Sequence, residues 1–310
     1  MALHTIPLER RTLHGVFSRD LPPILQIDPG DSIAFSALTD GWRLDPSSGN
    51  TPTHFARNKD EVELNGHALC GPIAIRGAQP GMTLEVHVDE VRVGNWGQSG
   101  AGGGSELSKQ LGLTPDDRAS MLWELDAEAL VGKNQYGHII TLRPFMGVMG
   151  LPPDLPGVHD TGPPRFCGGN LDCKELVAGS TLFLPITVPG ALFSAGDGHA
   201  AQGDGEVSGG AIECPLERVQ LTFQLRPELR LSTPRAHTPI GWITLGLHED
   251  LDEAAVIALS AMLDLMQEQY GLERAAALSL ASLVVDLRIT QIVDGVRGVH
   301  ALLPHGAIRR

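Results

Sequence analysis

The segment 193–209, FSAGDGHAAQGDGEVSG, contains the densest set of side chains that could do chemistry. Its ligand-type and acid–base residues are Asp197, His199, Gln202, Asp204 and Glu206. Its glycines disfavour a helix and allow tight turns of the backbone. The runs on either side, 180–185 and 210–225, have the composition of strands. We therefore expect a loop between two strands, of the kind that often binds a ligand or catalyses a reaction.

Spacing within this segment favours a metal site. Residues two apart point to one side of an extended chain, which pairs Asp197 with His199 and Asp204 with Glu206. An Asp and a His on one side are a common half of a zinc site. The segment has no lysine, which excludes a phosphate-binding P-loop, and His199 and Ala201 occupy EF-hand positions that need oxygen ligands. A solvated acidic turn remains the alternative.

Composition limits the class of protein. The chain has 310 residues, of which 42% are hydrophobic and 5% aromatic, with 37 Gly and 22 Pro, and this favours many short strands joined by turns. A net charge of −14 argues against a nucleic-acid partner, and no apolar run is long enough to span a membrane. The four cysteines show no CxxC spacing, so we expect reduced, buried thiols and a cytoplasmic location.

We expect three regions that are interleaved into one compact unit. They are an N-terminal β region (1–93), a central β region with most of the candidate residues (94–235) and an α+β region (236–310). In the N-terminal region, the alternating run TLEVHVDEVRV predicts a strand with His87 on its solvent face. The polar segment 46–62 is expected to form a surface loop or the wall of a pocket.

Local signals predict further elements. The Gly/Ser-rich segment 94–105 is expected to be flexible, and a short helix with Thr114 as its N-cap is expected within 113–132. An amphipathic helix is expected over 250–271, with an acidic cap at its start and glycine at its end. A second helix is expected over 273–284, followed by the strand DLRITQIV.

Four motifs, in the same order along the chain, resemble the acetamidase/formamidase family. They are GHALCGPIAIRGAQPG, PPRFCGGNLDCKEL, FSAGDGHAAQGDGEVSGGAIE and DLRITQIVDGVRGVHALLP. Two positions depart from the family pattern, because Cys70 replaces a threonine and Cys167 stands where a histidine often precedes GGN. The resemblance implies a mainly β fold, with a jelly-roll-like sandwich, a small barrel-like part and a late α+β portion containing a helical hairpin. It also implies a cytoplasmic homo-oligomer, a dimer or larger.

The implied activity is hydrolysis of a short-chain aliphatic amide, of the formamide or acetamide type, to a carboxylate and ammonia. Such an amidase acting on a linear C–N bond needs an activated water, a stabilised oxyanion and a proton for the leaving ammonia. A divalent metal, zinc before calcium, could supply the first two. The hypothesis assigns the metal to His67, Asp172, Asp197 and His199, the proton transfer to Glu206 with Asp204, and the orientation of the substrate amide to Asn170 and Gln202.

Three alternatives need different residues. A Cys173 thiol nucleophile assisted by Lys174 and Glu175 is disfavoured, because adjacent residues on a strand point to opposite faces. A serine nucleophile would need a Ser-rich Gly/Ser run with a lysine partner, and the run 100–105, GAGGGS, has too much glycine for that. A non-catalytic β-sandwich module could bind calcium or a carbohydrate through the acidic segment, but it would not need a carboxylate held beside an imidazole.

Overall fold

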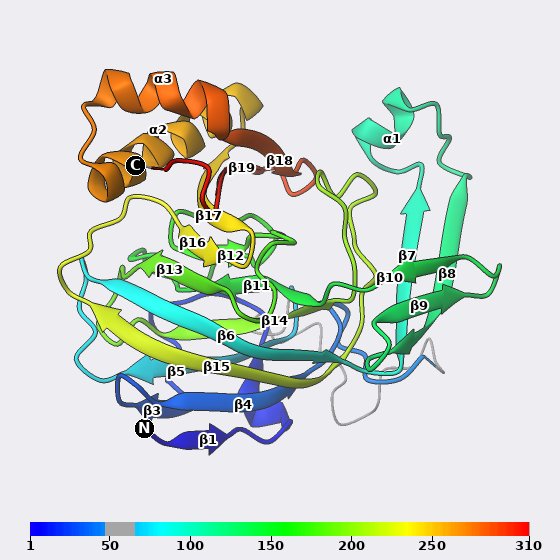
Figure 1. Cartoon of the computed structure of the whole chain (residues 1–310). Coiled ribbons are helices and arrows are strands. Elements are labelled where there is room, and N and C mark those ends of the chain that lie inside the picture. The colour runs from blue at the N-terminus through cyan, green and yellow to red at the C-terminus, as the bar shows by residue number, and fades with distance from the viewer. Residues whose placement is uncertain (47–65, 310) are drawn as a thin grey trace.

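The computed structural model describes residues 1–46 and 66–309, whose strands form three sheets (Figure 1). The largest sheet has nine strands in the order β1-β4-β15-β6-β13-β16-β17-β19-β18. Their bounds are β1 Leu3–Thr5, β4 Ser32–Ala37, β6 Thr83–Val93, β13 Thr181–Pro185, β15 Leu216–Arg226, β16 Arg235–Thr238, β17 Gly241–His248, β18 Asp286–Gln291 and β19 Arg297–Pro304. The expected regions 1–93, 94–235 and 236–310 all contribute strands to this sheet, although their division itself stays a prediction.

A second sheet packs on the first and completes a sandwich. Its order is β12-β11-β14-β5-β2, and β3 pairs with β5 outside this path. Its strands are β2 Leu13–His14, β3 Leu25–Ile27, β5 Leu69–Ile75, β11 Phe145–Gly150, β12 Gly168–Asn170 and β14 Phe193–His199. Phe193 of β14 meets Phe223 of β15 edge to face, with ring centroids 5.2 Å apart, in a core that also buries Ile73 of β5 and Val86 of β6. Side chains from the two inner faces therefore form one hydrophobic core.

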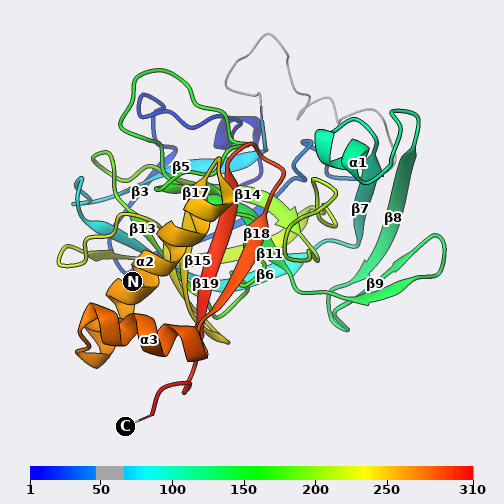
Figure 2. The ribbon, with the colours of Figure 1, turned by 90° about the horizontal axis from the view of Figure 1, so that it is seen from above.

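A third sheet of four strands stands out from the sandwich (Figures 1 and 2). It consists of β7 Trp96–Gly102, β8 Arg118–Asp126, β9 Val131–Asn134 and β10 Ile139–Thr141, with α1 Glu106–Gln110 between its first two strands. The expected flexible segment 94–105 and the expected helix within 113–132 are therefore both largely wrong. The two segments pair with each other in an antiparallel ladder from Trp96–Glu124 to Gly102–Arg118, and this pairing overrides the local signals.

The segment 193–209 is not a loop throughout, because its first seven residues form β14 in the middle of the second sheet. The prediction failed at Gly196 and Gly198, which were interpreted as turn residues. A Cβ at these positions would collide with the backbone of Ala68 and of Cys214, so glycine permits close packing within the sheet. The flanking strand 180–185 is confirmed as β13, whereas the strand expected over 210–225 begins at Leu216 as β15.

The C-terminal part agrees with the sequence. Helix α2 Leu251–Tyr270 begins at Asp250, whose carboxylate accepts the backbone N–H groups of Asp252 and Glu253, and ends at Gly271 in the left-handed conformation. Helix α3 Arg274–Val284 follows, and the two helices share a hydrophobic core with β19. Figure 1 shows them together at the top of the molecule.

The mainly β fold with a late helical hairpin is confirmed. None of the three sheets closes on itself in the described ranges 1–46 and 66–309, so the smaller part is an open four-stranded sheet. His87 is on a partly exposed face of β6, as expected. The segment 46–62, for which a loop or pocket wall was expected, lies outside the described residues apart from Pro46.

Candidate active site

Strand β14 ends in the candidate site and supplies Asp197 and His199, which are both nearly fully buried. The neighbouring strand β11 has Gly147 beside them. A Cβ on Gly147 would overlap Asp197 Oδ2 and would lie 2.7 Å from Asp172 Oδ1 and 2.8 Å from His199 Cε1. The missing side chain of Gly147 therefore provides the space in which three functional groups meet.

Asp172 reaches this space from the GGN motif. Strand β12 pairs with β11, and the chain then turns so that the backbone N–H groups of Leu171 and Asp172 both donate to Gly147 O. Asp172 is 1% exposed, and neither of its carboxylate oxygens accepts a hydrogen bond from the described part of the chain.

Three of the site carboxylates have left-handed backbone, which non-glycine residues rarely adopt. The φ angles are 46° at Asp172, 62° at Asp197 and 46° at Glu206. Such a conformation costs of the order of 1–3 kcal/mol per residue and persists only where the surrounding structure enforces it. Its concentration here supports a functional role for these three side chains.

Two overlapping groups of side chains have the composition and spacing to bind a metal. One contains Asp172, His199 and Glu206, and the other contains Asp197, His199 and Glu213, with the ligand atoms of each group within 4.8 Å of one another. The expectation of acidic and histidine groups that could hold a metal is thus confirmed. Glu213 was missed, because its segment was interpreted as a strand. A lone glutamate in the otherwise apolar run AIEC was the available signal.

The orientation of His199 is fixed by Gln202. Gln202 Nε2 donates to Asp172 O at 2.8 Å, which leaves Gln202 Oε1 to accept the Nδ1–H of His199 at 2.9 Å. The other ring nitrogen, Nε2, faces Asp197 Oδ2 at 3.3 Å and Glu213 Oε2 at 3.2 Å. His199 thus presents Nε2, and not Nδ1, to the second group of carboxylates.

Burial and neighbouring charges shift the pKa values of the site carboxyl groups. Burial, reinforced by the charge of Glu206, raises the pKa of Asp172 well above its usual value. Burial also raises the pKa of Glu206 to about 8 and that of Glu213 to about 7. Burial acts in the same direction on Asp197, but the charges of His199 and His67 outweigh it and lower its pKa to about 2.

Asp40 and Asp294 surround this centre, and burial raises the pKa of each. Asn170 donates from Nδ2 to Asp294 Oδ2 at 3.0 Å. His67 bonds through Nδ1 to Thr161 Oγ1 at 2.8 Å, and within the described chain it belongs to neither metal-capable group, although its charge acts on Asp197. Sequence reasoning gave no role to either outer aspartate.

The expected pairing of Asp204 with Glu206 is not observed. Asp204 Oδ2 lies 2.8 Å from Lys174 Nζ, whereas Glu206 is 93% buried and close to Asp172 and His199. The chain turns at Gly205, which has a φ of 95°, so the two carboxylates do not share one side of an extended segment.

Cysteine chemistry is disfavoured. Cys173 is fully buried, and burial raises the pKa of its thiol to about 12, which is opposite to what a thiolate nucleophile requires. Its neighbour Glu175 pairs with Arg143 and Arg288, and Lys174 pairs with Asp204. Neither residue is therefore free to assist the thiol.

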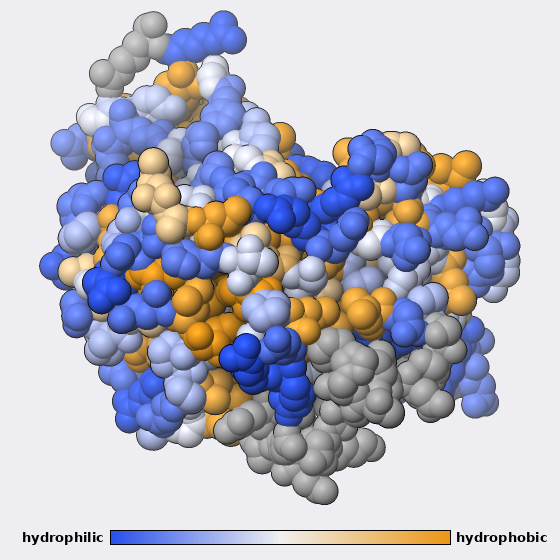
Figure 3. Space-filling view, turned by 90° about the horizontal axis from the view of Figure 1, so that it is seen from below, coloured by the Kyte–Doolittle hydropathy of each residue, from blue (hydrophilic) through white to orange (hydrophobic). Residues whose placement is uncertain are grey.

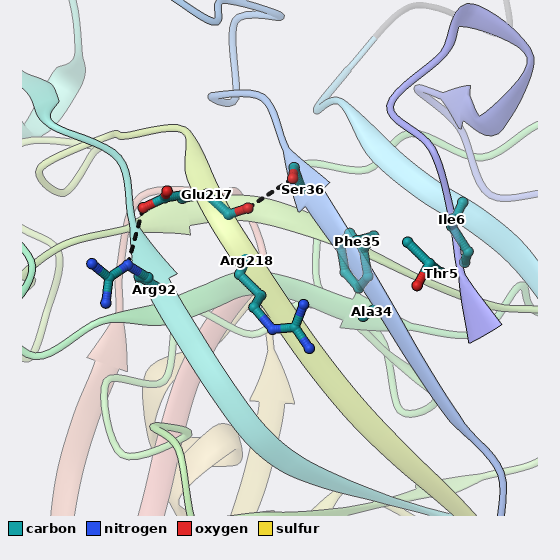
Figure 4. Close-up of a pocket in the computed structure, with 8 residues that line it drawn as sticks. All are labelled: Thr5, Ile6, Ala34, Phe35, Ser36, Arg92, Glu217 and Arg218. Atoms are coloured by element: carbon teal, nitrogen blue, oxygen red, sulfur yellow. Dashed lines mark hydrogen bonds and ion pairs between the residues drawn. The ribbon is translucent and has the colours of Figure 1, made fainter. Parts of the chain in front are cut away.

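Several surface pockets lie away from the group around His199. Figure 4 shows one with a volume of about 250 Å³ between β1, β4, β6 and β15. Its two arginines are neutralised, because Arg92 pairs with Glu217 at 3.0 Å and Arg218 pairs with Glu90 at 2.7 Å. Seen from below (Figure 3), the surface shows apolar residues between polar ones, a mixture that is normal for folded proteins. Neither feature offers chemistry comparable with the buried group around His199.

Comparison with known proteins defines the family. The chain matches the model of the Acetamidase/Formamidase family over residues 4–160 and 156–240, and it belongs to this family. An acetamidase of Mycolicibacterium smegmatis is 26% identical in an alignment that covers 64% of this chain and 63% of that protein. A formamidase of Methylophilus methylotrophus is 27% identical in an alignment that covers 65% of this chain and 61% of that protein. The resemblance found in the motifs is confirmed.

A solved structure extends the similarity to nearly the whole chain. The crystal structure of an acetamidase from Bacillus halodurans matches with a TM-score of 0.82 and 26% identity, covering 96% of this chain and 97% of that one. By sequence, the chain spans about three fifths of the length of the curated relatives it matches. In the part of the chain that the structure describes, no helix combines the length and apolar character that a membrane crossing needs.

Proposed function

We propose that this chain is an amidohydrolase that cleaves a short-chain aliphatic amide, of the formamide or acetamide type, to a carboxylate and ammonia. The observation that supports this most strongly is the buried, strained group of carboxyls around His199. The names of the two curated relatives, an acetamidase and a formamidase, support the class of substrate.

The donor set fits a divalent cation. Both carboxylate oxygens of Asp172, and one oxygen each of Asp197, Glu206 and Glu213, accept no hydrogen bond from any described residue. Buried carboxylates of this kind need a compensating charge. We assign Asp197, His199 Nε2 and Glu213 as ligands, because Gln202 occupies the opposite ring nitrogen. The imidazole favours zinc over calcium, which prefers oxygen ligands alone. Such a cation, when bound, would polarise a carbonyl oxygen and acidify a water.

The other two carboxyls supply proton transfer in this proposal. Asp172 Oδ1 lies 3.8 Å from His199 Nδ1, and Glu206 belongs to the same group of side chains. Because burial raises the pKa of both carboxyls, the pair can hold a shared proton near neutral pH. Glu206 removes a proton from the attacking water and returns it to the amide nitrogen as the C–N bond breaks. The carboxylic acid formed in this step gives its remaining proton to the solvent, which leaves carboxylate and ammonia as the products. Asp204 takes no part, since its carboxylate is paired with Lys174.

Replacing Glu206 by Gln tests this assignment, because the amide keeps the shape of the side chain and cannot accept the proton. We expect ammonia release from formamide and acetamide to fall by about 100-fold or more, while the zinc content stays at the wild-type level. Glu228→Gln, a change on the surface, is the matched control. Near-normal turnover in the Glu206 variant would reject its role.

Metal removal tests the proposed cofactor and the alternative function together. Ammonia release is measured with formamide, acetamide, propionamide and an aryl-acetamide before and after treatment with a chelator. Activity that is lost and then restored by zinc supports the proposal. Activity that the chelator does not change would reject the metal and keep the carboxyl groups as the only catalytic groups. No ammonia from any substrate would favour a non-catalytic module that binds calcium or a carbohydrate.

We further propose a cytoplasmic homo-oligomer, a dimer or larger. The projecting four-stranded sheet and its turns expose large apolar side chains, namely Leu122, Leu130, Val131, Tyr136 and Ile139. Surface of this kind is common where a second copy packs. All four cysteines are buried with free thiols, in keeping with a reducing compartment. Analytical ultracentrifugation would show a monomer if the proposed association is wrong.

A further inference from the structure

Asp294 belongs to the candidate site although it lies in the C-terminal part of the chain, far in sequence from the other site residues. It lies in the turn between β18 and β19, and its Oδ2 accepts the Nδ2–H of Asn170, the last residue of β12, at 3.0 Å. Its charge acts on Asp172 and on Glu206, so it is part of the same electrostatic group. The turn is held in place because Gln291 Oε1 accepts the backbone N–H of Asp294 at 3.3 Å.

The amide of Asn170 has one satisfied end and one free end. Asn170 is 3% exposed, yet its Oδ1 accepts no hydrogen bond from residues 1–46 or 66–309. An unpaired buried carbonyl costs about 1–3 kcal/mol, so it requires an explanation. Exchanging the amide O and N does not remove the problem, because Oδ1 would then face the carboxylate of Asp294. The free end of Asn170 is therefore an acceptor.

Asn170 Oδ1 and the Asp294 carboxylate are thus two acceptors on side chains that one hydrogen bond joins. The charge of Asp294 acts on Glu206, the residue that returns a proton to nitrogen in the proposed reaction. An unsubstituted amide has two N–H donors on its nitrogen, and this is the one polar group of the substrate that needs acceptors and not donors. The ammonia formed when the C–N bond breaks has the same requirement.

We propose that Asn170 Oδ1 and the carboxylate of Asp294 bind the NH2 group of the substrate and restrict the enzyme to unsubstituted amides. This inference rests on the proposed amidase function and adds the specificity-determining residue Asp294. An N-methyl group would replace a donor by a methyl and leave a buried acceptor unpaired. Sites built to pair a substrate N–H or O–H reject analogues that lack it far more strongly than apolar pockets reject a methylene.

Asp294→Asn is the test variant, because its carbonyl can still accept the Asn170 N–H while its NH2 places a donor where an acceptor was. The rates kcat/KM are measured for acetamide and N-methylacetamide. We expect kcat/KM of the wild type to be about 100-fold or more higher for acetamide than for N-methylacetamide. In the variant, kcat/KM for acetamide should fall by about tenfold or more, while kcat/KM for N-methylacetamide should not change. Asp286→Asn, an exposed position on β18, is the matched control and should behave as wild type. Equal rates on the two amides in wild type, or an unchanged preference in the variant, would overturn the inference.

A binding measurement separates this inference from the proposed function. Saturation-transfer NMR with acetamide and N,N-dimethylacetamide needs no turnover. Selective binding of acetamide that is lost in Asp294→Asn supports the acceptor pair, even if no ammonia forms and the amidase proposal fails. Hydrolysis of acetamide together with equal binding of both amides would keep the amidase and reject the acceptor pair. Binding of neither amide would reject both.

Discussion

Gly147→Ala would place one methyl group at the point where three functional side chains meet. The new Cβ would lie 2.7 Å from Asp172 Oδ1 and 2.8 Å from His199 Cε1, and closer still to Asp197 Oδ2. Ordinary contact begins near 3.4 Å, so the first two groups must each retreat by about 0.6–0.7 Å. All three belong to well-buried segments, which leaves little room for such a shift.

The expected size of the effect follows from this displacement. Overpacking a buried site costs about 1–3 kcal/mol in the free energy of unfolding, which the chain should survive as a folded protein with a lower Tm. Misplacing catalytic groups by about 1 Å can cost on the order of 100-fold in rate. We therefore expect ammonia release and zinc affinity to fall much more than stability does.

The assay compares Gly147→Ala with Gly104→Ala, a change at a position where an added Cβ has open space. Ammonia release, zinc content and thermal unfolding are measured on both. The control should match the wild type in all three. Full zinc content and full activity in Gly147→Ala would refute the argument that this glycine makes room for the site.

Two further predictions concern histidines. Gln202→Leu removes the acceptor that orients His199, so zinc affinity in a competition titration should fall about 10–100-fold. Gln202→Glu keeps an acceptor and should restore part of that affinity. Equal zinc affinities in the wild type and Gln202→Leu would show that Gln202 does not orient the ligand. Burial lowers the pKa of His14 to about 4, and its ring is neutral there, with Nδ1–H donating to Val16 O and Nε2 accepting from Ser194. Because the folded pKa is below the usual 6.5, its contribution to stability is present above pH 6.5 and is lost as the pH falls towards 4, by about 3 kcal/mol. Urea unfolding should show wild type and His14→Gln converging over this range; a constant difference would contradict the assignment.

The sequence predicted elements well where their signals are local. Helix α2 has an acidic cap, a periodic apolar face and a terminal glycine within one stretch of chain, and both ends agree with the structure. Prediction from the sequence was wrong where pairing between distant segments determines the secondary structure. The ladder between β7 and β8 turned an expected flexible segment and an expected helix into strands. At Gly196, a residue typical of turns serves close packing in the middle of a sheet.

The sequence by itself determined the family and the mainly β class, and it marked Asp172, Asp197, His199 and Glu206 as candidate site residues, because they lie in short, recognisable motifs. Only the tertiary structure decided which side chains join them. Glu213 faces His199 because the chain turns back after Glu206, and Asp294 meets Asn170 across 124 positions because the β18–β19 turn approaches β12. The folded backbone also separated Asp204 from Glu206, although they are two residues apart. Sequence spacing predicts the directions of side chains only where the backbone is regular, and at Asp172, Asp197 and Glu206 the backbone is left-handed.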